Sequence, residues 1–285
     1  MVLRTREPPA MIMGTMDVRV GSEAISTYIP TVSPPTGDDL PISSIASQPG
    51  ALLVLRTFTT LLVFVVTSGS LFAQDGKPKS ISMFDGKSLQ GWTGRPDLWS
   101  VADGAIVGKT TAENPLKKNT FLVWEGDAPA DFELRLKYWV EGGNSGIQYR
   151  SNVIEGAPEF VVGGYQADIE AANNFTGINY EERGRGILAQ RGQRVTISAT
   201  GEKQGEAFGD SKEIAKVFKT DGWNEYRVVA KGPKLQHFIN GQLTSEVIDN
   251  QSDKASKDGV IALQLHVGPA MVIRFKDLEI IPLAD

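Results

Sequence analysis

The chain has 285 residues with a net charge of −5 at pH 7, and it contains no cysteine. The acidic balance argues against a nucleic-acid partner, because proteins that bind nucleic acid usually present a basic surface. The absence of cysteine excludes disulfides, thiolate metal sites and a cysteine nucleophile, and 2 histidines are too few for a metal site with three histidine ligands.

The first 73 residues are predicted to lie outside the folded domain. Residues 1–50 are rich in Pro, Ser, Thr and Gly without a periodic apolar pattern, so they are predicted to be disordered or an over-extended start of the reading frame. Residues 51–73 place Arg56 before an apolar run of about ten residues and end in small residues at Ala73, as signal peptides do. That run is shorter than a membrane span, so we expect export to the periplasm or the extracellular space without a stable membrane anchor.

Residues 74–285 are predicted to form one all-β domain. Short alternating apolar runs are separated by Gly, Asp, Asn and Pro, and long amphipathic helical patterns are almost absent, which favours a β-sandwich with one or two short helices. Asn240-Gly241 predicts a tight hairpin turn, and Ser211 is the expected cap of a helix over 212–219. Residues 171–186 and 200–210 are predicted to be long loops. The predicted strands are 99–101, 105–108, 120–123, 132–140, 146–150, 165–170, 187–188, 194–197, 223–230, 235–239, 242–247, 259–266 and 271–281.

Three of these strands, 145–150, 165–170 and 261–266, carry polar side chains at every second position, and such positions share one face of a strand. Burial of these groups without partners would cost about 1–3 kcal/mol each, so they are expected to face outward. Their surface is either an ordinary solvated exterior or a concave binding face, if the three strands lie in one sheet. The residues concerned are Gln148, Arg150, Gln166, Asp168, Glu170, Gln264 and His266.

The amides and the arginine favour a carbohydrate ligand, with Tyr165, Trp139 or Trp223 available to stack on a sugar ring. Asp168 and Glu170 also resemble the carboxylate strand of retaining β-glucanases. Their Cα atoms would be about 6.7 Å apart along a strand, so an ordinary glycoside hydrolase remains an alternative. No phosphate-binding loop, His-Glu-x-x-His or EF-hand spacing is present. No cofactor is therefore expected, although Asp- and Asn-rich loops could hold calcium or another divalent ion.

The chain resembles the 3-keto-disaccharide hydrolase family over residues 84–283. The resemblance lies in Phe-Asp-Gly-Lys-Ser-Leu-Gln-Gly-Trp at 84–92 and in shorter motifs that follow in the family's order. It implies an exported protein with a concanavalin-like jelly-roll sandwich and a concave polar sheet face, acting on glycosides oxidised to a ketone at C3. The chain departs from the pattern at 166–170, where many relatives carry Glu-Val-Gln-Ile-Leu-Asp. The shorter motifs lie at 99–104, 131–134, 143–150, 164–168, 223–226, 240–241, 263–266 and 274–278.

The implied chemistry begins with loss of the C2 proton, continues with elimination of the C1 substituent and ends with addition of water. His266 is the first candidate for the general base, since histidine titrates near neutral pH. Asp168 is the alternative base or the group that orients His266, Glu170 could protonate the leaving oxygen, and Arg150 could stabilise the enolate. The alternatives are a non-catalytic carbohydrate-binding module and a surface interaction domain without sugar specificity. The expected substrate-binding residues are Asn144, Gln148, Gln166, Gln264 and Tyr165, together with Tyr180, Glu181, Arg183 and Arg185 in the loop over 171–186.

Overall fold

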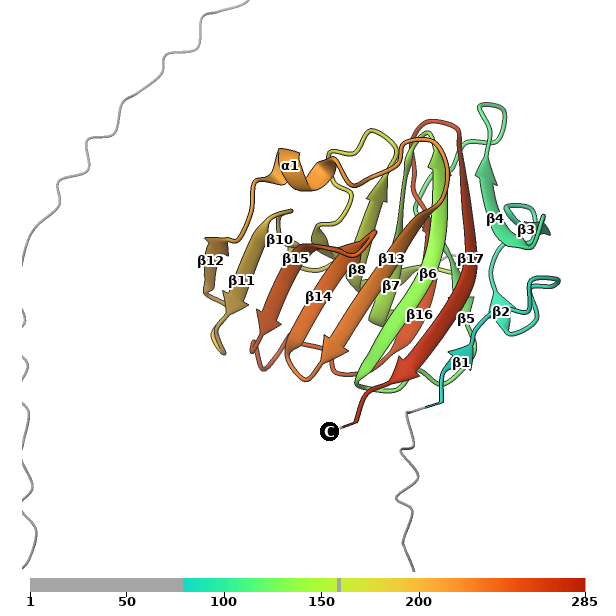
Figure 1. Cartoon of the computed structure of the whole chain (residues 1–285). Coiled ribbons are helices and arrows are strands. Elements are labelled where there is room, and N and C mark those ends of the chain that lie inside the picture. Colours follow the sequence, from blue (N-terminus) through green and yellow to red (C-terminus); the bar gives the residue numbers. More distant parts are fainter. Residues whose placement is uncertain (1–78, 158–159, 285) are drawn as a thin grey trace, which may run out of the picture. The chain divides into compact units, whose positions relative to one another are not determined.

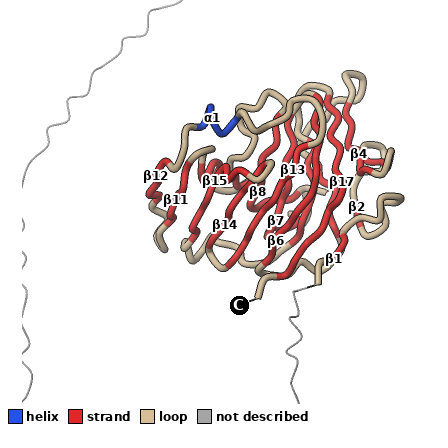
Figure 2. Tube along the Cα trace, in the orientation of Figure 1, coloured by secondary structure: helices blue, strands red, loops and turns tan. Residues whose placement is uncertain are grey.

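The computed structural model describes residues 79–157 and 160–284, which form a sandwich of two β-sheets (Figures 1 and 2). The predicted all-β jelly-roll sandwich is therefore confirmed. The predicted disordered segment and signal peptide lie outside the described residues. The single helix within the described ranges has 5 residues, which is too short to cross a bilayer.

One sheet is ten-stranded, and nearly all of its strand pairs are antiparallel. The hairpin of its strands β14 (Lys234–Ile239) and β15 (Gln242–Asp249) turns at Asn240 and Gly241, which both have positive φ angles, as the Asn-Gly pair predicts. The order across the sheet is β12 (Lys203–Ala207), β11 (Gln193–Ile197), β15 (Gln242–Asp249), β14 (Lys234–Ile239), β13 (Asn224–Lys231), β6 (Phe132–Glu141), β17 (Met271–Pro282), β4 (Ala105–Thr110) and β3 (Trp99–Ala102), with β1 (Ile81–Ser82) paired to β17.

The other sheet is seven-stranded and antiparallel. Its order is β10 (Gly186–Ala189), β9 (Asn179–Glu182), β8 (Val162–Glu170), β7 (Asn144–Val153), β16 (Val260–Leu265), β5 (Thr120–Trp124) and β2 (Trp92–Thr93). The predicted long loops were thus partly wrong, because residues 171–186 contain β9 and the first residue of β10, and residues 200–210 contain β12. Strand β9 reads Asn-Tyr-Glu-Glu and β12 reads Lys-Gln-Gly-Glu-Ala, so neither shows the apolar alternation by which a strand is recognised from sequence.

Helix α1 (Ser211–Ala215) is shorter than predicted and begins one residue earlier. The Asp210 carboxylate accepts hydrogen bonds from the backbone N–H groups of Lys212 and Glu213, at 2.8 and 2.9 Å. Asp210 rather than Ser211 is therefore the N-cap, because its side chain satisfies the free amides of the first turn.

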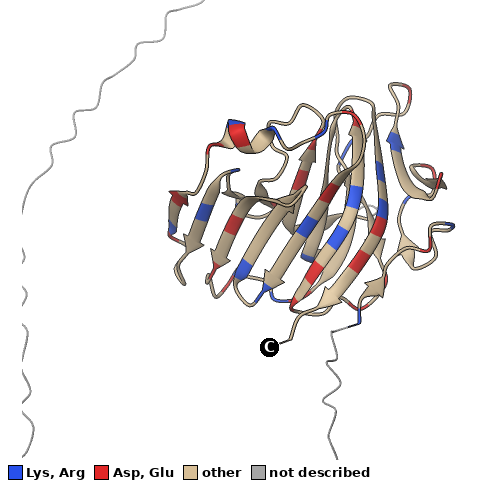
Figure 3. Cartoon of the chain, in the orientation of Figure 1, with Lys and Arg blue, Asp and Glu red and all other residues tan. Residues whose placement is uncertain are grey.

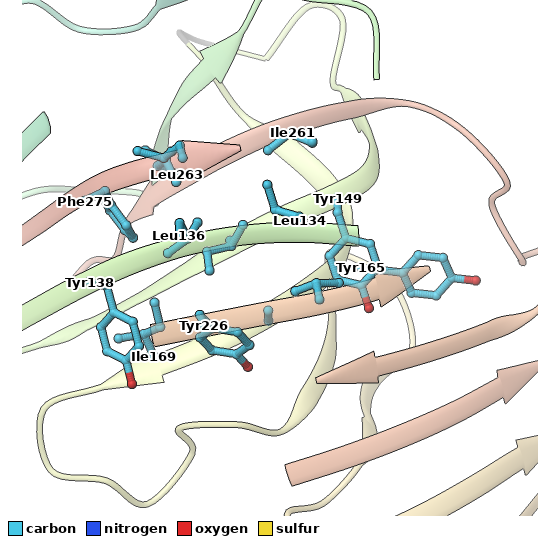
Figure 4. Packing of buried hydrophobic residues seen from close by; sticks show 14 of the residues in the cluster. Leu134, Leu136, Tyr138, Tyr149, Tyr165, Ile169, Tyr226, Ile261, Leu263 and Phe275 are labelled. Carbon is cyan, nitrogen blue, oxygen red and sulfur yellow. The ribbon is translucent and has the colours of Figure 1, made fainter. Parts of the chain in front are cut away.

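The core lies between the sheets and is rich in tyrosine (Figure 4). Tyr138 and Tyr226 enter it from the ten-stranded sheet, while Tyr149, Tyr165 and Ile169 enter from the seven-stranded sheet, and all are almost fully buried. The Tyr149 and Tyr165 rings stack with their centroids 5.7 Å apart. Because alternate residues of a strand face opposite sides, the neighbours of Tyr165 and Ile169 must face outward.

The outer face of the ten-stranded sheet carries bands of opposite charge on β6, β13 and β17 (Figure 3). Glu133, for example, pairs with Arg135 at 2.5 Å and with Arg227 at 3.4 Å. Trp139 and Trp223 also lie at this sheet, where Arg274 and Lys276 cover their rings. These tryptophans are therefore remote from the predicted polar face, which belongs to the other sheet.

Candidate active site in a cavity of the seven-stranded sheet

The three polar strands are neighbours, as predicted. Strand β7 pairs with β8 on one side and with β16 on the other, so that Gln148 lies opposite Gln166 and next to Ala262. Their outward positions border a cavity of about 740 Å³, within the size range of small-molecule sites. The polar side chains around it include Asn144, Gln166, Asp168, Tyr180, Glu182 and His266.

Asp168 is a buried carboxyl group in the wall of the cavity, with 6% of its surface exposed. Asn144 Nδ2 donates to its Oδ1 at 3.2 Å, and the backbone N–H of Ile169 donates to the same atom at 3.1 Å. The pKa of Asp168 is raised to about 7, chiefly by burial and to a smaller extent by the charges of Glu170 and Glu182, against the lowering effect of these hydrogen bonds. At neutral pH this group can both accept and donate a proton.

A chain of buried glutamines lies beside Asp168, and Gln166 is the member of it that lines the cavity floor. Gln166 Oε1 accepts hydrogen bonds from Gln148 Nε2 at 2.6 Å and from Gln264 Nε2 at 2.9 Å. At the Gln148 end of this chain, the Ser151 hydroxyl donates a hydrogen bond to Gln148 Oε1 at 2.8 Å. The Gln166 amide nitrogen is therefore the end of this side chain available to a ligand, because its oxygen is occupied twice. Gly146 makes room for Gln166, since a Cβ atom at position 146 would lie 2.6 Å from Gln166 Cδ.

Two buried oxygen atoms near this floor have no protein partner. They are Asn144 Oδ1 and Gln264 Oε1, although the amide nitrogens of both side chains donate to neighbouring residues. Buried acceptors without partners are uncommon, because each loses its hydrogen bonds to water. Asn144 lines the cavity, so a ligand hydroxyl group would satisfy its Oδ1, whereas Gln264 is fully buried outside the lining.

His266 is half-buried at the rim, just beyond the end of β16. Its Nδ1 lies 2.5 Å from the carbonyl oxygen of Val267. A carbonyl only accepts, so Nδ1 carries a proton, and the proton-accepting position of a neutral imidazole here is Nε2. The backbone N–H of Val267 donates in turn to Asn119 Oδ1 at 2.9 Å, which holds this loop in place.

Glu170 borders the cavity, but its carboxylate binds a loop. Its Oε2 accepts the backbone N–H groups of Asn174 at 2.7 Å and of Phe175 at 3.1 Å. The predicted role of proton donor to a leaving group does not suit a carboxylate held in this way. These hydrogen bonds hold the backbone of the residues between β8 and β9.

Arg150 does not join the polar face, contrary to the sequence prediction. A register shift between Tyr149 and Asn152 interrupts the β7–β8 pairing, and Arg150 has a φ of 45°. Its guanidinium donates to the carbonyls of Ala130 and Gly232 and pairs with Asp131 at 3.0 Å, rather than with Asp168. Such a bulge ends the strict alternation on which the prediction rested.

Other predicted binding residues also lie outside the cavity lining. Gln148 and Gln264 are fully buried and contact Gln166 rather than the cavity. Tyr165, Glu181, Arg183 and Arg185 lie elsewhere. Tyr165 points into the core and donates to Asp249 Oδ2 at 2.6 Å. Glu181 pairs with Arg185 at 2.7 Å on the opposite face of β9, and Arg183 is exposed outside the cavity lining. Tyr180 does line the cavity, as predicted.

Two polar residues of the site were missed. Glu182 alternates with Tyr180 on β9, so its position would have followed from the two-residue period had this segment been recognised as a strand. Its carboxylate accepts from Asn119 Nδ2 at 3.3 Å and from Gln264 Nε2 at 3.5 Å. Asn119 precedes β5 and carries no sequence signal that distinguishes it.

The second histidine, His237, is fully buried between the sheets. Burial lowers its pKa to about 3, so the ring is neutral. Its Nδ1 lies 3.1 Å from the carbonyl oxygen of Ile178, and its Nε2 lies 2.9 Å from the Tyr149 hydroxyl. His237 therefore ties the ten-stranded sheet to a residue of the cavity lining and has no access to a ligand.

No group of three or more His, Asp or Glu side chains within residues 79–157 and 160–284 is arranged to hold a metal ion. Oxygen ligands from loop backbone are not tested by this observation, so calcium stays a prediction.

Residues 79–281 match the model of the 3-keto-alpha-glucoside-1,2-lyase-like domain family. No match was found among curated proteins. A candidate glycosyl hydrolase from Parabacteroides distasonis is 18% identical, with 72% of this chain and 100% of that chain covered and a TM-score of 0.47. A carbohydrate-binding module from Bacillus subtilis is 13% identical over 67% and 95% of the two chains, with a TM-score of 0.43. A β-glucanase from Bacillus licheniformis is 11% identical over 74% and 100%, also with a TM-score of 0.43.

Proposed function

We propose that this chain, which belongs to the 3-keto-alpha-glucoside-1,2-lyase-like family, cleaves glycosides that carry a ketone at C3. The observation that carries the proposal is the buried Asp168 with a pKa of about 7, set beside amide groups in a cavity of sugar size. Elimination across C1 and C2 followed by hydration needs a base near neutrality and hydrogen-bonding groups, but no carboxylate nucleophile. The glutamine at position 166 suits this requirement.

Asp168 is the base of the proposed reaction. Its carboxylate takes the C2 proton, which the C3 ketone makes acidic, and the electron pair forms the enolate. The C1–O bond then breaks as the enolate collapses to a C1=C2 enone, and Asp168 returns the proton to the departing oxygen. A group with a pKa of about 7 can perform both transfers at neutral pH.

Tyr180 stabilises the enolate in this mechanism. Burial raises its pKa, and the charges of Glu182 and Asp168 raise it further, so the phenol stays protonated as a hydrogen-bond donor. The Gln166 amide nitrogen is the second donor. Arg150 lies elsewhere, and none of the described residues that line the cavity is Lys or Arg. The negative charge of the enolate is therefore stabilised by neutral hydrogen-bond donors.

His266 serves the hydration step. Its unprotonated Nε2 takes a proton from the water that adds to C1, and C2 regains a proton from solvent. The sum of the two steps is hydrolysis of the glycosidic bond. His266 thus acts on water, whereas sequence reasoning favoured it as the base for C2.

The test is the Asp168→Asn variant with a methyl glucoside oxidised at C3, followed by enone absorbance and by mass spectrometry of the product. General-base catalysis is worth about 10²- to 10⁴-fold, so turnover should fall at least about 100-fold. Asp253→Asn is the matched control, since Asp253 is exposed and outside the cavity. Full turnover by Asp168→Asn would refute the assignment.

A non-catalytic carbohydrate-binding module is the second candidate. The unpartnered acceptor Asn144 Oδ1 favours it, because Asn144 lines the cavity and a hydroxyl group of any sugar could donate to this oxygen without chemistry. This candidate predicts equal binding of oxidised and unoxidised sugars and no product from either. Calorimetry with both sugar forms, beside the turnover assay, separates the two functions.

A further inference from the structure

The cavity has an apolar rim above its polar floor. Two of the five large hydrophobic side chains that are exposed within the described residues, Phe175 at 44% and Val267 at 41%, line this one cavity. By contrast, Gln166 and Asp168 on the floor are only 2% and 6% exposed. The polar side chains therefore lie at the bottom of the cavity, and the exposed apolar side chains lie at its entrance.

Phe175 and Val267 come from loops on opposite sides of the floor. Phe175 follows β8 and Val267 follows β16, and β7 lies between these strands with Asn144 at the same end. The ends of β8 and β16 are thus two strand spacings apart, about 10 Å. A flat ring between two apolar side chains needs about 7 Å, because each contact takes about 3.5 Å.

Hydrogen bonds hold the backbone of the loop that carries Phe175 and of the loop that carries Val267. The Glu170 carboxylate accepts the backbone N–H of Phe175, and Thr176 Oγ1 donates to the Glu170 carbonyl at 2.8 Å. The Val267 N–H is bound by Asn119. Exposed hydrophobic side chains on an ordered backbone lose little conformational freedom when a ligand binds, which favours a binding role.

We propose that Phe175 and Val267 clamp the leaving group of the substrate, and that the site takes glycosides with an aromatic aglycone in preference to disaccharides. The inference rests on the proposed function. An aromatic ring contacts both apolar side chains over its whole face. A second sugar contacts them only through its C–H groups and loses hydrogen bonds to water wherever its hydroxyl groups meet them. Glu170 is then a positioning residue that holds Phe175.

The test uses phenyl and methyl glucosides of both anomers and a glucose disaccharide, each oxidised to the ketone at C3. The measured quantity is the ratio of kcat/KM for phenyl over methyl substrate. The Phe175→Ala variant should lower this ratio about tenfold, as expected for loss of one aromatic contact, and Phe175→Tyr should restore it. Glu170→Ala should lower it in the same direction.

Val153→Ala is the matched control, because Val153 is 47% exposed at the other end of β7 and lies outside this cavity. It should leave the ratio unchanged. An unaltered ratio in Phe175→Ala, or disaccharide turnover equal to that of the phenyl substrate, would overturn the clamp while leaving the proposed function intact.

Equilibrium binding of unoxidised phenyl and methyl glucosides separates the two proposals. If no ketone substrate is turned over but phenyl glucoside binds more tightly in a Phe175-dependent way, the clamp stands and the proposed function fails. If phenyl and methyl glucosides bind equally and neither ketone form reacts, both proposals are refuted.

Discussion

Replacing Asp168 with asparagine should stabilise the protein at high pH and change its stability little at low pH. Burial raises the pKa of this carboxyl from its ordinary value of 3.8 to about 7 in the folded state. The folded protein therefore keeps a proton that the unfolded chain releases. Stability from this group is fully present below pH 3.8 and is lost as the pH rises through about 7.

The size of the effect follows from the two pKa values. The interval from 3.8 to about 7, at about 1.36 kcal/mol per pH unit, corresponds to about 4 kcal/mol. Asparagine has the shape of the protonated acid, and its amide oxygen can still accept from Asn144 Nδ2 and from the Ile169 N–H. The variant therefore removes the cost of a buried charge and keeps both hydrogen bonds.

Urea unfolding at pH 4 and at pH 8 measures this cost. The free energy of unfolding of Asp168→Asn, minus that of the wild type, should increase by about 4 kcal/mol from the lower to the higher pH. Taking this difference cancels the other titrating groups, and Asp253→Asn should show no such change. An equal difference at both pH values would show that Asp168 titrates normally, and the argument for it as a base near neutrality would fail.

Three further outcomes are expected. Gly146→Ala should displace Gln166 and weaken ligand binding at least about tenfold in calorimetry, with an unchanged circular dichroism spectrum, because the added Cβ would lie 2.6 Å from Gln166 Cδ. Arg150→Met should lower the free energy of unfolding by about 3 kcal/mol, since it breaks a buried pair with Asp131, while folded protein keeps its kcat; a lost kcat would return Arg150 to the active site. The kcat/KM should rise as pH increases through about 7, where Asp168 becomes ionised, and a flat profile would contradict its role.

Local pattern was enough to predict the fold class and one face of the site. The two-residue alternation in residues 165–170 placed Gln166 and Asp168 opposite the core, and the structure confirms this separation. Asn240-Gly241 predicted its hairpin for the same reason, because a tight turn depends on the φ angles of its own two residues. Both signals lie within a few residues of the chain.

The tertiary structure alone decided where alternation stops and what surrounds each group. The bulge after Tyr149 depends on how β7 pairs with its neighbours, and it carried Arg150 away from the cavity. Glu182 and Phe175 joined the site because β9 and the preceding loop pack beside β8. The pKa of Asp168 depends on burial by segments distant in sequence. A one-residue shift in strand pairing exchanges the two faces of a strand, and this pairing depends on residues distant in the sequence. The desolvation that raises a pKa depends on distant residues too. A local sequence pattern therefore determines neither the end of the alternation nor the pKa.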